Sequence, residues 1–304
     1  MKIGMSTTEL EKLYDRDTYC RMLAEAGFEA VDADFIHMLH YTDVTRCVRS
    51  GVFTEEGDAW KQHFRTLGET YARWGLIPFQ AHAPFPTWTG WDGDYDRWLV
   101  EVMKKTIIGT AMIGCDRLVI HPCFGLDWSE RLSPEAEFEL NIRVYSELAE
   151  TARQEGVTLL LENMFQAVRG KLYQACCSDL AVACRMVDEL NRLAGDERFG
   201  FCVDTGHLQV LGLPAGESLA ILGKRIKAFH VHDNDGARDL HLAPYFGIQD
   251  WDDFAKGLRR IGWQDPLCME AVYALGHFDP ALHADLLRLI CHAGRVIAEK
   301  AEKP

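Results

Sequence analysis

Short apolar runs alternate with longer amphipathic segments along the whole of this 304-residue chain. Eight of the runs are almost continuously apolar, which is typical of parallel strands that are covered on both faces. We expect strands at residues 2–5, 28–35, 78–82, 117–122, 157–163, 199–205, 226–232 and 266–272.

Between these runs, apolar residues recur at the spacing of an α-helix. The clearest example is residues 133–156, where Ser133 is a candidate N-cap and Gly156 a candidate stop. The same periodicity predicts further helices at residues 178–195 and 279–303.

Eight strands that each precede a helix predict an α/β fold, a single (β/α)8 TIM barrel over residues 1–304. The longest connection is expected around residues 36–76. The alternative is a doubly wound open sheet, which should carry a GxGxxG loop after its first strand. Residues 4–10 contain no such loop, so the pattern favours the barrel.

The chain carries 32 Lys and Arg against 46 Asp and Glu, a formal net charge of −14. This balance argues against nucleic acid as a partner, because nucleic-acid affinity rests on clustered Lys and Arg. The ten cysteines lack a CxxC spacing and are expected to be reduced thiols. Without a signal peptide or an apolar stretch of ~18 residues, we expect a cytoplasmic protein with no membrane partner.

In a (β/α)8 barrel the active site lies at the carboxyl ends of the strands. The last six predicted strands each deliver an imidazole or a carboxylate to that rim. These residues are His82, His121, Glu162, Asp204 with His207, His230 with His232, and Glu270, and Asp239 and His241 follow the seventh strand. Burying so many ionisable groups together is costly unless something compensates, and a divalent cation does so. We therefore predict a metal site.

Four segments carry a family resemblance: LLLEN (159–163), VDTGH (203–207), HVHDNDG with DLH (230–241), and the ME of the eighth strand. They resemble the xylose isomerase-like TIM-barrel superfamily, which holds the sugar phosphate isomerase/epimerase and endonuclease IV-like families. The resemblance covers nearly the whole chain.

In the epimerase branch, one metal is held by Glu, Asp, His and Glu from strands five to eight. The positions that match this pattern are Glu162, Asp204, His230 and Glu270. In the endonuclease IV branch, further ligands build a trinuclear zinc site. The candidates for these, as additional metal ligands or substrate contacts, are His82, His121, His207, Asp239 and His241.

The resemblance to 3-epimerases implies that Glu162 and Glu270 also act as a catalytic acid/base pair on opposite faces of a sugar. A bound Mn²⁺, Zn²⁺, Co²⁺ or Mg²⁺ would stabilise the enediolate, and the number of ions stays open. His232 is expected to support its neighbours or to contact substrate, since it shares a strand face with His230.

The segment after the third strand, residues 84–98, is expected to be a rim loop that carries Trp88 and Trp91. Their rings suit the apolar faces of a sugar, or they pack against a neighbouring loop or subunit. Arg238, after the seventh strand, is a candidate for binding a substrate phosphate or carboxylate.

These features predict a metal-dependent sugar isomerase or epimerase that abstracts a proton next to a carbonyl. The expected substrate is a small carbohydrate or a polyol ketone such as an inosose. A lyase of the inosose dehydratase or keto-glycoside cleaving type is the alternative. A DNA-repair endonuclease fits less well, because Asp92, Asp94 and Asp96 in the rim loop would repel phosphate. A non-catalytic binding module is the fourth reading. The number of subunits stays open, with a homo-oligomer among the alternatives.

Overall fold

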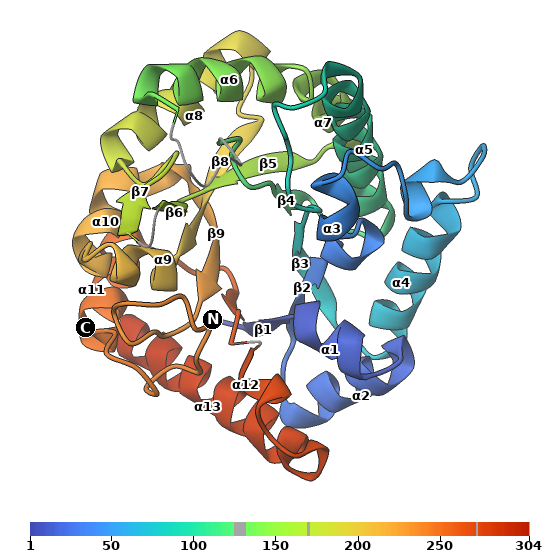
Figure 1. The fold of residues 1–304 in the computed structure, drawn as a ribbon. Helices are drawn as coiled ribbons and strands as arrows, with labels where there is room; N and C mark the ends of the chain where they lie inside the picture. The colour runs from blue at the N-terminus through green and yellow to red at the C-terminus, as the bar shows by residue number, and fades with distance from the viewer. Residues whose placement is uncertain (125–131, 169–170, 272, 304) are drawn as a thin grey trace. The chain divides into compact units, whose positions relative to one another are not determined.

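The computed structural model describes residues 1–124, 132–168, 171–271 and 273–303. Eight strands form a closed parallel barrel in the order β1-β10-β9-β8-β5-β4-β3-β2 (Figure 1). The barrel strands are β1 (Ile3–Ser6), β2 (Ala30–Asp34), β3 (Ile77–His82), β4 (Arg117–Val119), β5 (Thr158–Glu162), β8 (Phe199–Asp204), β9 (Ile226–Val231) and β10 (Leu267–Met269). The predicted TIM barrel is confirmed.

Each barrel strand falls within or overlaps one predicted apolar run. Strands β4 and β10 end earlier than predicted, yet their chains run on beside the neighbouring strands. Ile120 donates from its backbone N–H to the carbonyl of Leu160, and Glu270 donates likewise to Val231, both over 2.9 Å. Val272, the predicted last residue of the eighth strand, lies outside the described residues.

Helices flank the barrel strands. Their bounds are α1 (Thr8–Leu13), α2 (Arg16–Ala26), α3 (Tyr41–Val44), α4 (Lys61–Arg73), α5 (Gly93–Met112), α6 (Pro134–Ser146), α7 (Ala149–Glu155), α8 (Leu180–Ala194), α9 (Thr205–Val210), α10 (Ala215–Leu222), α11 (Trp251–Ile261), α12 (Tyr273–Gly276) and α13 (His283–Glu302). In the described part of the chain, no helix combines the length and the apolarity that crossing a membrane requires.

The helix predicted for residues 133–156 is in fact two helices. Helix α6 begins after Ser133, whose hydroxyl accepts a hydrogen bond from the Ala136 N–H. The N–H groups of Glu147 and Leu148 then bond three residues back, which tightens the turn and ends α6. Helix α7 follows and stops at the left-handed Gly156, as predicted.

The connection between β2 and β3 contains α3, α4 and two short 3₁₀ turns (Ile36–Met38 and Val52–Thr54). A second feature was not predicted: after β5, an antiparallel hairpin forms from β6 (Phe165–Val168) and β7 (Lys171–Gln174). Its second strand is mostly exposed, so it lacks the continuous apolar run that marks the barrel strands.

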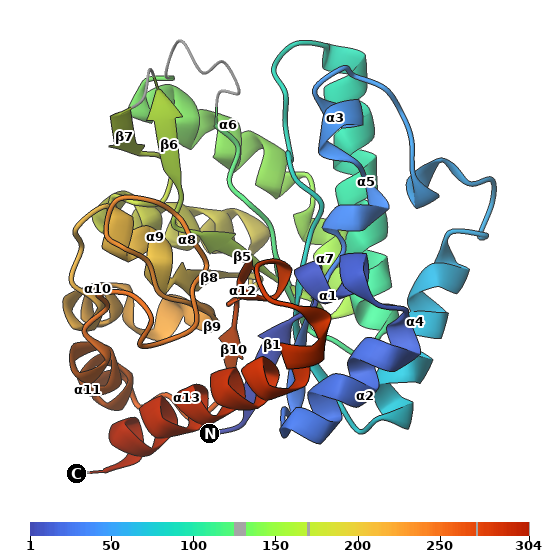
Figure 2. The ribbon, with the colours of Figure 1, turned by 60° about the horizontal axis from the view of Figure 1, so that its bottom comes forward.

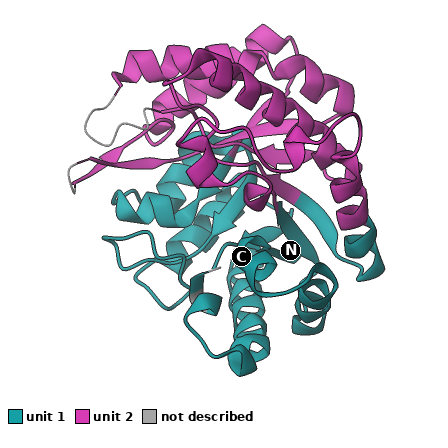
Figure 3. Ribbon diagram, turned by 45° about the vertical axis from the view of Figure 1, so that its right-hand side comes forward, with its two compact units in different colours: residues 1–33, 69–79, 202–304 teal, residues 34–68, 80–201 magenta. Residues whose placement is uncertain are grey.

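The chain groups into two compact units, residues 1–33, 69–79 and 202–304, and residues 34–68 and 80–201 (Figure 3). In the first unit, α13 packs against β1 and β10 (Figure 2), and Gly294 permits the close approach. A Cβ at this glycine would lie 2.9 Å from Cγ2 of Ile3. In the second unit, Phe64 of α4 packs against Phe35, Phe53 and Trp60.

Candidate metal centre and active site

His230, in strand β9, is held by an unpredicted partner from strand β2. Its Nε2 lies 2.9 Å from Oδ2 of Asp32, and both side chains are only 1% exposed. Because a carboxylate accepts the hydrogen bond, Nε2 carries the proton and Nδ1 is left with its lone pair. The Nδ1 atom faces Glu270, whose Oε2 is 3.5 Å away.

Asp204, the last residue of β8, has two roles in the local structure. Its Oδ1 accepts the backbone N–H of His207 over 2.6 Å and so begins helix α9. Its Oδ2 lies 3.0 Å from Nε2 of His232. Gly206, which lies between Asp204 and His207 in the sequence, leaves room for the His232 imidazole. A Cβ at this glycine would lie 1.9 Å from Cε1 of His232. His232 therefore supports Asp204, a predicted metal ligand. This agrees with the first of the two expectations for His232, that it supports its neighbours.

The loop after β9 adds a carboxylate and a second imidazole. Oδ2 of Asp239 lies 3.1 Å from Nε2 of His241 and 3.4 Å from Nε2 of His207. Burial raises the pKa of Asp239, but the two imidazoles outweigh burial and hold that pKa well below its usual range. The His241 ring stacks on His232 with a centroid separation of 4.1 Å. Burial first, and then His232, lower the pKa of His241 despite the opposing effect of Asp239.

These side chains in the first unit converge on one another closely enough to hold a cation. One donor atom each from Asp204, His230 and Glu270 lie within 4.8 Å of one another, and so do donor atoms of His232, His241 and Glu270. Carboxylate oxygens and neutral imidazole nitrogens are the usual ligands of divalent zinc and manganese. The donor set therefore fits such an ion.

The second unit holds another group, at the ends of β3, β4 and β5. Nε2 of His121 lies 3.0 Å from Nε2 of His82 and 3.1 Å from Oε2 of Glu162. Nδ1 of His82 donates to the carbonyl of Ala83 over 2.8 Å, so its Nε2 carries the lone pair. Two imidazoles and a carboxylate in contact again form a donor set suited to a metal.

The rim loop differs from the expectation in its acidic residues. Helix α5 already begins at Gly93, and Asp92 caps it by accepting from the N–H groups of Asp94 and Tyr95. Asp96 is 1% exposed, so the prediction that it repels phosphate at the rim was wrong. Its carboxylate instead accepts hydrogen bonds from the rim turn that precedes α5. Only Asp92 and Asp94 remain exposed, and Asp94 is paired with Arg97.

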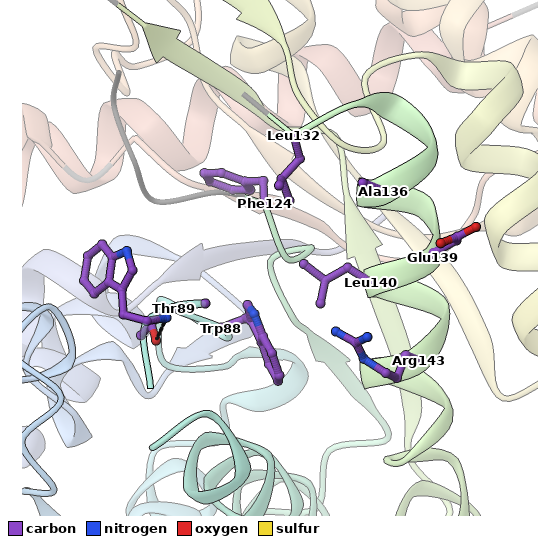
Figure 4. A pocket seen from close by; sticks show the side chains of 10 residues that line it. Trp88, Thr89, Phe124, Leu132, Ala136, Glu139, Leu140 and Arg143 are labelled. Carbon is purple, nitrogen blue, oxygen red and sulfur yellow. Dashed lines mark hydrogen bonds between the residues drawn. The ribbon is translucent and has the colours of Figure 1, made fainter. Parts of the chain in front are cut away.

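Both predicted rim tryptophans line a pocket of about 520 Å³ in the second unit (Figure 4). The guanidinium of Arg143, on α6, lies 5.6 Å from the centre of the Trp88 ring. Trp91, which also lines the pocket, is half exposed. Arg238, by contrast, is exposed and bonded to Asp235 over 2.7 Å, and its substrate contact stays a prediction.

Sequence reasoning missed Asp32 and Arg143. The signal for Asp32 was present, because strand β2 has the sequence AVDAD and so places two acidic residues inside an otherwise apolar strand. A buried carboxylate in such a strand needs a partner, and an imidazole at the same rim supplies one. Arg143 gave no such signal, since it lies in an amphipathic helix with several other charged residues.

A family model described as a xylose isomerase-like TIM barrel matches residues 20–290. Among solved structures, a D-psicose 3-epimerase determined in the presence of D-fructose is similar, with a TM-score of 0.70 and 15% identity over 98% of this chain and 99% of that one. A 3-keto-D-glucoside 4-epimerase from E. coli has a TM-score of 0.73 and 16% identity over 97% and 99% of the two chains. The IolI protein with a bound zinc atom has a TM-score of 0.66 and 18% identity over 99% and 98%.

The curated relatives match a smaller share of this chain than the solved structures do. An uncharacterized protein of Sinorhizobium fredii is 26% identical over 62% of this chain and 60% of its own length. An uncharacterized protein of Methanocaldococcus jannaschii is 27% identical over 56% of each chain. The chain thus spans well under two thirds of the length of the curated relatives it matches.

Proposed function

Because this chain belongs to the xylose isomerase-like TIM-barrel family, we propose that it is a divalent-metal-dependent sugar isomerase or epimerase. It removes a proton next to the carbonyl of a small carbohydrate or polyol ketone. The observation that carries the proposal is the convergence of Asp204, His230 and Glu270, with Asp32 behind the imidazole.

Glu162 is the fourth ligand in this proposal. It ends strand β5, and the N–H of Leu159 in that strand donates to the carbonyl of Arg198, just before β8, over 2.9 Å. Parallel neighbours end at the same rim, so Glu162 and Asp204 belong to adjacent strand ends. His82 and His121, which contact Glu162, orient this carboxylate or hold a further ion.

When bound, a divalent cation supplies Lewis-acid stabilisation for the negative charge that develops on the substrate oxygens. The chain's own residues move the proton. One of Glu162 and Glu270 takes it from the carbon beside the carbonyl, and the other returns one to the opposite face or to the neighbouring carbon. His207 lies beside Asp204, and His241 lies beside Glu270. In this proposal both imidazoles bind substrate hydroxyls.

Similar solved structures support a sugar-like substrate. They include a D-psicose 3-epimerase, a 3-keto-D-glucoside 4-epimerase and an L-ribulose 3-epimerase. The net charge of −14 and the presence of both Glu139 and Arg143 in the rim pocket favour a neutral substrate over a phosphorylated one.

The test is solvent exchange. The metal-loaded protein is incubated in D₂O with a panel of keto-hexoses, keto-pentoses, 3-keto-glucosides and inososes, and products are followed by NMR. We expect deuterium at the carbon next to the carbonyl of at least one compound, together with its epimer or isomer. A dehydrated or cleaved product would assign the lyase alternative instead. Absence of exchange across the panel, with cleavage of abasic DNA, would replace the proposal by the endonuclease reading.

A further inference from the structure

We propose that the pocket between Trp88, Trp91 and helix α6 is a subsite for a second, non-reacting ring of the substrate. The substrate is accordingly a neutral glycoside rather than a free monosaccharide. This inference rests on the proposed function, because it takes the reacting ring to lie at the metal-ligating residues. The pocket volume of about 520 Å³ is in the range that holds a small ligand.

The turn that presents the two indoles is rigidly built. Oδ1 of the buried Asp96 accepts from the N–H of Thr89 over 2.8 Å and from its hydroxyl over 2.7 Å, and Oδ2 accepts from the N–H of Gly90 over 3.1 Å. The Thr89 hydroxyl then accepts from the N–H of Trp91 over 3.2 Å. Gly90 has a φ of +77°, which a residue with a Cβ adopts only with strain. A turn held in this way presents its indoles in a fixed arrangement, which a preorganised binding site requires.

The walls of the pocket suit a ring without net charge. Phe124 and Leu140 supply apolar surface, and the half-exposed Trp91 adds a further aromatic ring to the lining. Among the described residues of the lining, Arg143 is the one cation and Glu139 the one anion, so their formal charges cancel. Figure 4 shows the Trp88 ring and the Arg143 guanidinium facing one another. An aromatic face beside such polar groups binds the apolar side of a ring and leaves its hydroxyls to the polar groups.

The pocket adjoins the histidine group of the same unit, with Phe85 and Thr87 between them. The Thr87 hydroxyl, one residue before Trp88, donates to the carbonyl of His121 over 3.0 Å. The ring of Phe85 lies 4.9 Å from that of His121 and 6.1 Å from that of Phe124, which lines the pocket. The single Phe85 ring thus contacts both the pocket wall and the histidine group. This proximity is the reason for proposing a second ring of the same substrate rather than an independent ligand.

The test is calorimetric and independent of turnover. The Mn²⁺-loaded protein is titrated with phenyl β-D-glucopyranoside, cellobiose and methyl β-D-glucopyranoside, of which only the first two carry a second ring. We expect the two-ring compounds to bind about tenfold more tightly than the methyl glucoside. Trp88→Ala and Trp91→Ala should each reduce that preference several-fold. Trp98→Ala, on α5 and outside the pocket lining, is the matched control and should retain it.

The proposed subsite is overturned if all three compounds bind equally or if none of them binds. It is also overturned if the preference for two-ring compounds survives both tryptophan substitutions. Arg143→Ala, an exposed position, repeats the test if a tryptophan variant fails to fold. Solvent exchange separates this result from the proposed chemistry. Exchange without a ring preference removes the subsite and leaves the isomerase, whereas a preference without exchange keeps the ring site and removes the isomerase.

Discussion

The Nε2 atom of His230 donates a hydrogen bond to Oδ2 of Asp32 over 2.9 Å, and this bond joins β9 to β2 although β10 and β1 lie between them in the barrel. Because it fixes the tautomer and the ring orientation, removal of the carboxylate should weaken metal binding. We expect Asp32→Ala to raise the dissociation constant for Mn²⁺ about 10- to 100-fold. Competition with a chelator of known affinity measures the change.

Two further variants sharpen this prediction. Asp32→Asn retains an oxygen that can accept from Nε2, so its metal affinity should lie between those of Asp32→Ala and the wild type. Asp34→Asn, two residues along the same strand, changes a carboxylate that accepts from the Ile36 N–H and should bind metal normally. Unchanged affinity in Asp32→Ala would show that His230 does not depend on this bond.

Glu162→Gln and Glu270→Gln should each abolish turnover and solvent exchange, because an amide cannot take up the substrate proton. Rates are measured with the compound that exchanges fastest in the wild-type protein, and metal content is measured in parallel. Glu101→Gln, an exposed position on α5 paired with Lys104, serves as control. A wild-type rate in either active-site variant would remove that residue from the acid/base role.

Removal of bound metal should destabilise the folded state. A ligand present at 100 times its dissociation constant adds about 2.7 kcal/mol to the free energy of unfolding. A chelator should therefore lower the melting temperature, and Mn²⁺, Zn²⁺, Co²⁺ or Mg²⁺ should restore it to different extents. Elemental analysis of the loaded protein and of His82→Ala separates one ion from several. If none of the four ions raises the melting temperature, the predicted metal site is wrong.

The metal-free protein should lose stability between pH 7.5 and 5.5, in part through His241. Burial lowers the pKa of this imidazole below its ordinary value of 6.5. As the pH falls through 6.5, the unfolded chain takes up the proton before the folded chain does, so unfolding becomes easier. Urea titrations at both pH values measure the loss in the free energy of unfolding.

His241→Asn should reduce that loss, and asparagine tolerates the positive φ of +46° found at this position. His40→Gln, at an exposed site, should leave it unchanged. An equal loss in the wild type and in His241→Asn would assign the pH dependence to other groups.

Most of the barrel was predictable from sequence because strands covered on both faces need apolar residues at almost every position. The helix predicted at residues 178–195 is α8, and it obeys equally local rules, because Asp179 caps its start and the left-handed Gly195 ends it. The β6–β7 hairpin was missed because its exposed strand carries no such constraint. Of its four residues, Lys171–Gln174, only the aromatic Tyr173 is half-buried, and the other three are exposed.

The candidate site was predictable for residues that end a strand, since position along the strand then determines the rim they reach. His82, Glu162 and Asp204 are the last residues of their strands. Roles that depend on contacts distant in sequence were not accessible. The pairing of Asp32 with His230 spans 198 residues, and the burial of Asp96 depends on how the rim turn folds onto α5.

The turn that presents Trp88 and Trp91 is anchored on α5 through Asp96, whereas Asp204 and His230 are fixed by β8 and β9. Replacing the side chain of Trp88 or Trp91 leaves the hydrogen bonds of Asp96 and Asp204 in place. In evolutionary terms, the molecules accepted and the reaction performed become separately inherited traits. Under the proposed function and the proposed ring subsite, a lineage carrying this chain would acquire new substrates by altering the rim turn and would keep the residues proposed to move the proton.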